Sequence, residues 1–117
     1  MEFRFSPEQE QFRHDVRAFL ETELSTAEGV EARSEGYSQA FSKKLAGRGW
    51  IGVAWPPEYG GGGLGIIEQL IFREELVGAE APIGYHMTAE RQVGPTLLLH
   101  GTERQRAEMI PRIVSSG

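Results

Sequence analysis

Side chains that commonly carry catalysis are few in this 117-residue sequence and lie far apart along it. The histidines are His14, His86 and His100, and their spacing does not match the H-E-x-x-H pattern of a metal site. Asp15 is the only aspartate and no G-x-S-x-G motif occurs, so a Ser-His-Asp nucleophile is not indicated. Because cysteine is absent, thiolate zinc sites, cysteine nucleophiles and disulfides are excluded. The residues themselves therefore predict no catalytic group and no metal site.

A run of glycines formally matches the dinucleotide-binding pattern G-x-G-x-x-G through Gly60, Gly62 and Gly65. That pattern binds phosphate when it follows a β-strand inside a βαβ unit. Here the sequence Trp-Pro-Pro-Glu-Tyr precedes the glycines, and no parallel sheet is indicated elsewhere in the chain. The favoured interpretation is a tight loop that packs closely against neighbouring helices.

The remaining polar candidates favour structural roles. Glu74 falls on the apolar side of its predicted helix, where a buried carboxylate needs a partner such as an arginine. Its neighbour Glu75 points to another side of the helix, so the two do not form a paired-carboxylate site. His14 is expected to face solvent, and His100 precedes a helix-ending glycine. His86 either lines a pocket or makes a structural hydrogen bond, and the second interpretation is favoured.

Helices must position these groups, because capping residues and apolar spacings of three and four residues recur along the chain. Ser6 and Gln9 form a capping box before an apolar stripe, and Thr102 and Gln105 form a second one. Because the helix at 66–79 is apolar nearly all round, we expect it to be central and buried. The predicted helices cover residues 7–24, 38–46, 66–79, 85–92 and 96–100, with a last one opening at 102.

Several stretches are expected to interrupt these helices. Residues 25–37 are polar and poorly periodic and predict a connector with room for a partial helical turn. Residues 49–65 hold tryptophans, prolines and glycines and predict an ordered loop. Gly94-Pro95 predicts a break between two helical segments, and Pro111 is expected to kink or divide the last helix. With no sheet indicated, the predicted fold class is all-α, an orthogonal bundle of about five helices.

Charge and hydropathy narrow the function classes further. Twelve basic against 17 acidic side chains give a formal net charge of −5, which argues against a nucleic-acid partner. No apolar stretch approaches the roughly 20 residues that span a bilayer, so no membrane partner is expected. The first residues, MEFRFSPEQEQ, lack the pattern of a signal or transit peptide. We therefore expect a cytoplasmic protein.

Several motifs follow one another in order along nearly the whole chain. A helix of the form S-P-E-Q…R…V…F covers residues 6–19, and PEYGGGGLG covers residues 57–65. A helix containing REEL and then the segment GPTLLLHGTERQRAEMIPRI come next. This ordered set resembles the N-terminal helical domain of FAD-dependent acyl-CoA dehydrogenases. The GPT…HG form is similar to the actinobacterial branch, which acts on large acyl-CoA substrates such as steroid side chains.

The resemblance implies an oxidoreductase that dehydrogenates an acyl-CoA thioester between its α and β carbons. A glutamate removes the α-proton, FAD accepts a hydride, and an electron-transfer flavoprotein takes the electrons. Residues 1–117 would be the N-terminal domain, with the middle β-barrel and the C-terminal helical bundle outside this chain. Those absent domains would supply the catalytic glutamate and most FAD contacts, so this portion alone is expected to be inactive. Family members are commonly homo- or hetero-tetramers.

The same resemblance implies where this domain meets the acyl-CoA substrate. In the family, the helix before the H-G-T-E-x-Q segment forms a wall of the acyl pocket. The substrate-binding candidates on that helix are Tyr85, His86, Thr88, Ala89 and Gln92. No residue is assigned to the cofactor. Two other interpretations stay open, a non-enzymatic helical module that binds a partner protein, and an acyl-CoA oxidase or flavin monooxygenase of the same fold.

Overall fold

The computed structural model describes residues 4–115, so residues 1–3 and 116–117 of the predicted domain lie outside the described residues. Between positions 4 and 115 the chain is helical without a β-strand, and a single isolated bridge joins Tyr37 to Ile83. This confirms the all-α fold class. The α-helices are α1 (Pro7–Leu24), α2 (Ala27–Glu35), α3 (Gln39–Gly47), α4 (Ile66–Gly78), α5 (Gly84–Thr88), α6 (Gly94–His100) and α7 (Glu103–Val114). A 3-10 turn, η1 (Pro57–Tyr59), lies in the loop before α4, and a π turn, η2 (Ala89–Val93), joins α5 to α6.

Side-chain caps begin the helices where the sequence predicts them. The Gln9 amide N–H donates to Ser6 Oγ at 3.1 Å, and the Ser6 N–H donates back to Gln9 Oε1 at 2.8 Å. Thr102 and Gln105 repeat this reciprocal arrangement at the start of α7, with distances of 3.1 and 2.9 Å. Each box satisfies two backbone donors that the first helical turn leaves unpaired. Both predicted capping boxes are confirmed.

The connector predicted at 25–37 is wrong, because residues 27–35 form the full helix α2. Thr26 caps it by accepting from the Gly29 N–H at 3.0 Å, and Gly36 ends it with a left-handed φ of 80°. Gly29 lies so close to α1 that an added Cβ would stand 2.2 Å from the Glu23 carbonyl oxygen. Close contact with α1 therefore positions α2, which lacks an apolar stripe of its own. The periodicity of residues 25–37 does not reveal such a contact, so the helix was not predicted.

The break predicted at Gly94-Pro95 is also wrong, since α5, η2 and α6 follow one another without interruption from residue 84 to 100. Gly94 keeps helical angles, φ −59° and ψ −54°, although the residue before a proline usually avoids them. Its N–H bonds to the carbonyl of Ala89, five residues back, as in a π turn. The Thr96 hydroxyl donates to the Gln92 carbonyl at 2.7 Å. The wider turn thus accommodates the proline, and Pro111 likewise lies inside α7 without dividing it.

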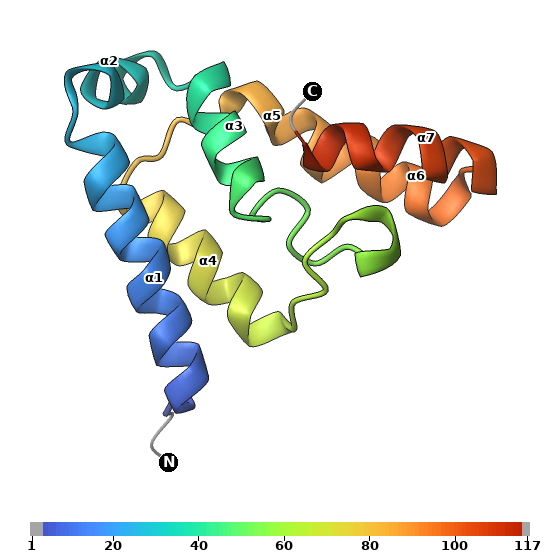
Figure 1. Ribbon diagram of the computed structural model, residues 1–117, viewed down its shortest axis with the longest axis horizontal. Coiled ribbons are helices and arrows are strands. Elements are labelled where there is room, and N and C mark those ends of the chain that lie inside the picture. The colour runs from blue at the N-terminus through green and yellow to red at the C-terminus, as the bar shows by residue number, and fades with distance from the viewer. Residues whose placement is uncertain (1–3, 116–117) are drawn as a thin grey trace.

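The core lies between α1, α3, α4 and the loop after α3. Its buried members are Val16, Phe19, Leu20, Leu24, Phe41, Leu45, Ile51, Val53, Phe72 and Leu76. Helix α4 contributes only one face to it, because Ile66, Leu70 and Val77 are 72, 56 and 68% exposed. The expectation that this helix is central and buried is therefore wrong. It lies beside α1, which forms the edge of the molecule in Figure 1.

The described residues form a thin slab of 41 × 39 × 20 Å. Figure 1 shows α1 and α4 side by side at one end, and α6 and α7 paired at the other. Helix α3 and the loop at 48–65 lie between these two pairs (Figure 1). A slab of this thickness has room for about two helix layers, so broad helix faces are left at its surface. In the part of the chain that the structure describes, no helix is both long and apolar enough to cross a bilayer.

Candidate functional site

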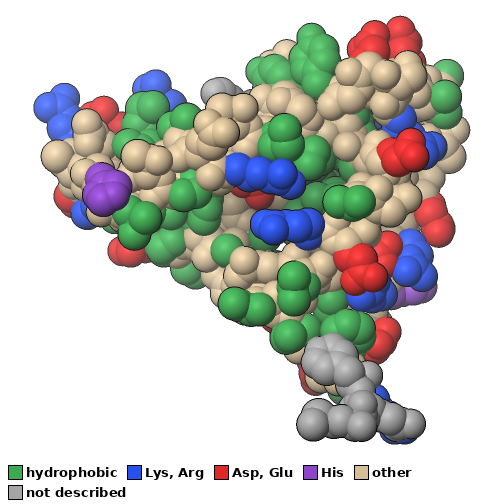
Figure 2. All heavy atoms as spheres, turned by 180° about the vertical axis from the view of Figure 1, so that it is seen from behind, with side chains coloured by type: hydrophobic (Ala, Val, Ile, Leu, Met, Phe, Trp, Pro, Cys, Tyr) green, Lys and Arg blue, Asp and Glu red, His purple; other side chains and the backbone are tan. Residues whose placement is uncertain are grey.

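A cavity of about 390 Å³ lies where α4, the loop at 52–55 and the α5–η2–α6 segment meet. Its apolar lining comes from Val53, Trp55, Phe72, Leu76, Ile83 and Pro95. Polar side chains that line it are Gln69, Arg73, His86, Glu90 and Arg91. Figure 2 shows basic side chains beside a hollow near the middle of the rear face. This size and mixed lining are those of a small-molecule pocket.

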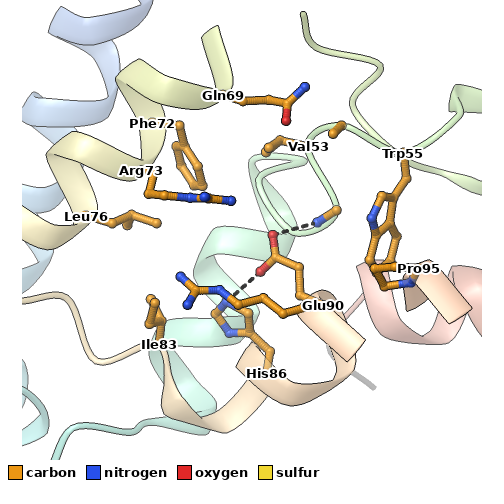
Figure 3. A pocket seen from close by; sticks show the side chains of 13 residues that line it. Val53, Trp55, Gln69, Phe72, Arg73, Leu76, Ile83, His86, Glu90 and Pro95 are labelled. Atoms are coloured by element: carbon orange, nitrogen blue, oxygen red, sulfur yellow. Dashed lines mark hydrogen bonds and ion pairs between the residues drawn. The ribbon is translucent and has the colours of Figure 1, made fainter. Parts of the chain in front are cut away.

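A series of polar contacts beside the cavity joins α3, α5, η2 and the 52–55 loop. Figure 3 shows its His86–Glu90–loop part. Ser42 Oγ lies 2.6 Å from His86 Nδ1, and His86 Nε2 lies 3.4 Å from Glu90 Oε2. The other carboxylate oxygen of Glu90 accepts from the Gly52 N–H at 3.3 Å. With Nε2–H facing the carboxylate, Nδ1 accepts the hydroxyl hydrogen of Ser42. Because Ser42 is fully buried, its hydroxyl cannot reach a ligand. The series Ser42–His86–Glu90 is therefore not a nucleophilic triad.

The structure separates the five predicted substrate-binding residues into two groups. His86 is buried and lines the cavity, so it combines the pocket role and the structural hydrogen bond considered from the sequence. Tyr85, Thr88 and Gln92 are exposed and Ala89 is half-buried, and none of the four lines the cavity. Their spacing of three, one and three residues places them along one side of α5–η2. We call Tyr85, Thr88, Ala89 and Gln92 the outer stripe.

Several residues of the cavity have no counterpart among the sequence-based candidates. Glu90 follows His86 by four residues, and that helical spacing is the signal that points to their contact. Arg73 extends from α4 toward the cavity (Figure 3), and Arg91 lines it from η2. Neither guanidinium makes an ion pair within residues 4–115. Only the folded chain shows that α4 and η2 face the same space.

The glycine-rich loop is not shaped to hold a dinucleotide such as FAD. Its amides bond within the loop region, since Gly62, Gly63 and Leu64 donate to the carbonyls of residues 52, 55 and 53 at 3.2, 2.9 and 2.8 Å. A phosphate cradle needs such N–H groups free to face the ligand. An added Cβ at Gly61 would lie 2.3 Å from the Trp55 carbonyl oxygen, so backbone already fills the space. The predicted tight loop is confirmed, but its glycines pack mainly against residues 52–57 of the same loop, and Gly60 alone of residues 60–63 is shown against a neighbouring helix, α7.

The ion pair predicted for Glu74 exists, but the expectation that Glu74 lies on the apolar side of its helix is wrong, because its side chain is exposed and Glu75 makes the closer contacts. Arg13 and Arg17 each contact Glu75 at 2.7 Å and so tie α1 to α4, while Glu74 contacts Arg13 at 3.2 Å. Glu75 is the more buried carboxylate, with 11% of its side chain exposed against 69% for Glu74. The hydrogen bond from Arg17, followed by that from Arg13, lowers the pKa of Glu75. His14 is exposed and His100 is the last residue of α6, and no cluster of three metal-binding side chains occurs among residues 4–115.

Comparison with known proteins places this fold in a family. A sequence model described as "Acyl-CoA dehydrogenase, N-terminal domain" matches residues 6–117. The chain belongs to this family. Acyl-CoA dehydrogenase FadE26 of Mycobacterium tuberculosis is 35% identical over 98% of this chain, and mitochondrial isovaleryl-CoA dehydrogenase of Pongo abelii is 31% identical over 94%. The sequence-based resemblance is confirmed.

This acyl-CoA dehydrogenase domain is similar to solved structures of multi-chain enzymes. The "ChsE4-ChsE5 complex from Mycobacterium tuberculosis" matches it with a TM-score of 0.80 and 32% identity over 99% of this chain and 30% of that one. The "Tcur3481-Tcur3483 steroid ACAD" matches with a TM-score of 0.80 and 31% identity over 99% of this chain and 31% of that one. The domain spans 30 and 27% of the length of FadE26 and of the isovaleryl-CoA dehydrogenase.

Proposed function

We propose that this chain is the N-terminal domain of a longer FAD-dependent acyl-CoA dehydrogenase and that its outer stripe forms a wall of the acyl pocket. The observation that carries the proposal is the exposure of Tyr85, Thr88 and Gln92 on one side of α5–η2, in a chain that belongs to this family. An exposed stripe with an aromatic ring, a hydroxyl and an amide suits a surface that other domains and a ligand cover. The reaction would be α,β-dehydrogenation of an acyl-CoA thioester.

The cofactor and partners follow from the same proposal. The family is generally FAD-dependent. Since the glycine loop has its amides engaged, FAD would be held mainly by domains outside this chain. An electron-transfer flavoprotein would accept the electrons, and the enzyme would be a cytoplasmic homo- or hetero-oligomer. The similarity to a steroid acyl-CoA dehydrogenase supports a large acyl group as substrate.

The first test uses the purified full-length protein that carries this domain. We expect bound flavin with a yellow absorption band, and anaerobic addition of a steroid side-chain acyl-CoA should bleach that band. The proposal would be overturned if none of the acyl-CoAs tested bleached the band, or if the full-length protein were colourless. Rapid reoxidation by air with release of hydrogen peroxide would instead indicate the oxidase alternative and would also contradict the dehydrogenase assignment.

A substitution in the outer stripe tests the pocket wall itself. Gln92→Phe adds bulk where the acyl group would pack, so kcat/KM for the bulky acyl-CoA should fall about tenfold or more. The matched control is Gln11→Phe, which changes another exposed glutamine, on α1. Steady-state kinetics with an electron acceptor dye gives both values. Equal kcat/KM in the two variants would remove the outer stripe from the pocket.

A further inference from the structure

We propose that Glu90 is a positioning residue for the outer stripe, because its contacts on the inner side of the helix fix the π turn that sets the direction of those four side chains. The inference rests on the proposed function, since it concerns which acyl groups the wall admits. It assigns Glu90 no contact with substrate.

The π turn lies within the outer stripe. Residues 85 and 88 belong to α5, whereas 89 and 92 belong to η2. A π turn holds one residue more per turn than an α-helix, in which each residue turns the chain by about 100°. Relaxation of η2 to an α-helix would therefore rotate Tyr85 and Thr88 by about one residue relative to α6. The π turn thus sets the direction of Tyr85 and Thr88 relative to α6.

Glu90 holds the beginning of this turn from inside. One of its carboxylate oxygens accepts the Gly52 N–H at 3.3 Å, and the other lies 3.4 Å from His86 Nε2 (Figure 3). The imidazole is fixed in turn by buried Ser42 on α3 at 2.6 Å. The Glu90 carboxylate is thus held by the 52–55 loop and, through His86 on the preceding helical turn, by α3. Hydrogen bonds to a carboxylate are directional, so the bond from the Gly52 N–H constrains the angle of the helix as well as its distance.

Trp55 holds the end of the turn. An added Cβ at Gly94 would lie 2.2 Å from Cη2 of Trp55, so the helix backbone rests directly on the indole ring. Trp55 itself is only 7% exposed and belongs to the same loop that supplies the Gly52 N–H. The loop at 52–55 therefore contacts η2 at both its ends. Because these contacts fix the inner side of the helix, they also fix the direction in which the side chains of the outer stripe point.

The decisive measurement is a selectivity ratio in the full-length enzyme. For each variant, kcat/KM is measured with a bulky steroid side-chain acyl-CoA and with butyryl-CoA, and the two values are divided. Loss of folded protein lowers both values equally, so a purely structural role of Glu90 would leave the ratio unchanged. We expect Glu90→Ala to change the ratio about fivefold or more, because small misplacements of a pocket wall have large kinetic effects.

Further variants keep the test conclusive. Glu90→Gln retains an oxygen for the Gly52 N–H and an amide that pairs with the other tautomer of His86, so its ratio should stay within about twofold of wild type. Glu90→Asp shortens the side chain and should reproduce the alanine effect if Glu90→Ala fails to fold. Glu108→Ala, on an exposed ion pair of α7, is the control and should leave the ratio unchanged.

Hydrogen exchange separates this proposal from the function on which it rests. Amides of residues 89–94 should exchange faster in Glu90→Ala than in wild type, whatever the substrate. Faster exchange together with a changed ratio supports the positioning role. An unchanged ratio in an active enzyme, or unchanged exchange, would overturn it. A wild-type enzyme inactive with every acyl-CoA would overturn the proposed function and the selectivity role together, and faster exchange there would show only that Glu90 holds the turn.

Discussion

The region formed by α1, α3 and α4 and the region from α5 to α7 are held by different forces. The first contains the ten-residue buried cluster, with Trp50 lying edge-on to Phe12, Phe19 and Phe72 at its border. In the described part of the second, Ile110 is the only buried large hydrophobic side chain. There, polar bonds at His86 and Glu90 and the close contact at Gly94 replace apolar burial.

The two regions thus differ in how much buried apolar area holds them, although both leave apolar side chains at the surface. Buried apolar area stabilises the first region without help from any other chain. Exposed large apolar side chains occur in both regions, since Ile66, Leu70 and Val77 of α4 are 56 to 72% exposed. In the second region, Tyr85, Val93, Leu99 and Met109 are between 40 and 77% exposed. Large apolar side chains that face solvent commonly mark surfaces covered by another domain or a ligand. The region that carries the outer stripe is thus also the one less able to fix its own geometry through its core.

Truncating one leucine in each region should give the largest contrast. Leu45→Ala removes a fully buried side chain from the cluster and should lower the free energy of unfolding by about 2–5 kcal/mol, because it leaves a cavity. Leu99→Ala removes a side chain that is 77% exposed and should change it by about 0.5 kcal/mol or less. Urea denaturation followed by circular dichroism measures both. Similar losses for the two variants would show that the regions are equally packed.

A smaller effect is expected where the second region rests on the loop. Gly94→Ala places a methyl group against the Trp55 ring, and the required shift should cost about 1–3 kcal/mol of unfolding free energy. Gly78→Ala is the control, since nothing lies within 4 Å of its added Cβ. Alanine favours helix there, so Gly78→Ala should stabilise the protein by about 0.5–1 kcal/mol. If Gly94→Ala were stabilising as well, the Trp55 contact would not hold η2.

The features predicted correctly from the sequence are those that neighbouring residues determine. The capping boxes at Ser6 and Thr102 join groups three residues apart, so the sequence alone predicts both. Helix α2 and the π turn were not, because they depend on Gly29 against α1 and on Gly94 against Trp55. The apolar residues of α4 predicted a buried helix, yet no other described element covers Ile66 or Leu70.

The site divides in the same way. The family resemblance predicts the four residues of the outer stripe together with His86. Helical spacing alone places those four on one side of the helix. The cavity behind it needs α4, the 52–55 loop and η2 to meet, which no local pattern encodes. Glu90 and Arg73 were therefore missed, although the four-residue spacing of His86 and Glu90 was available as a signal.

The smallest effect concerns the charged contact at the edge of the first region. The hydrogen bonds that Glu75 accepts from Arg17 and Arg13 lower its pKa below the ordinary value of 4.5, so the folded state favours the ionised carboxylate. The resulting stability is fully present above pH 4.5 and is lost as pH falls through the lowered folded value. At pH 7, Glu75→Gln should cost about 1–2 kcal/mol, and Glu74→Gln, at an exposed carboxylate, much less. Urea denaturation at several pH values should show wild type and Glu75→Gln converging in acid. A gap that persists below that transition would mean that Glu75 acts through packing and not through its charge.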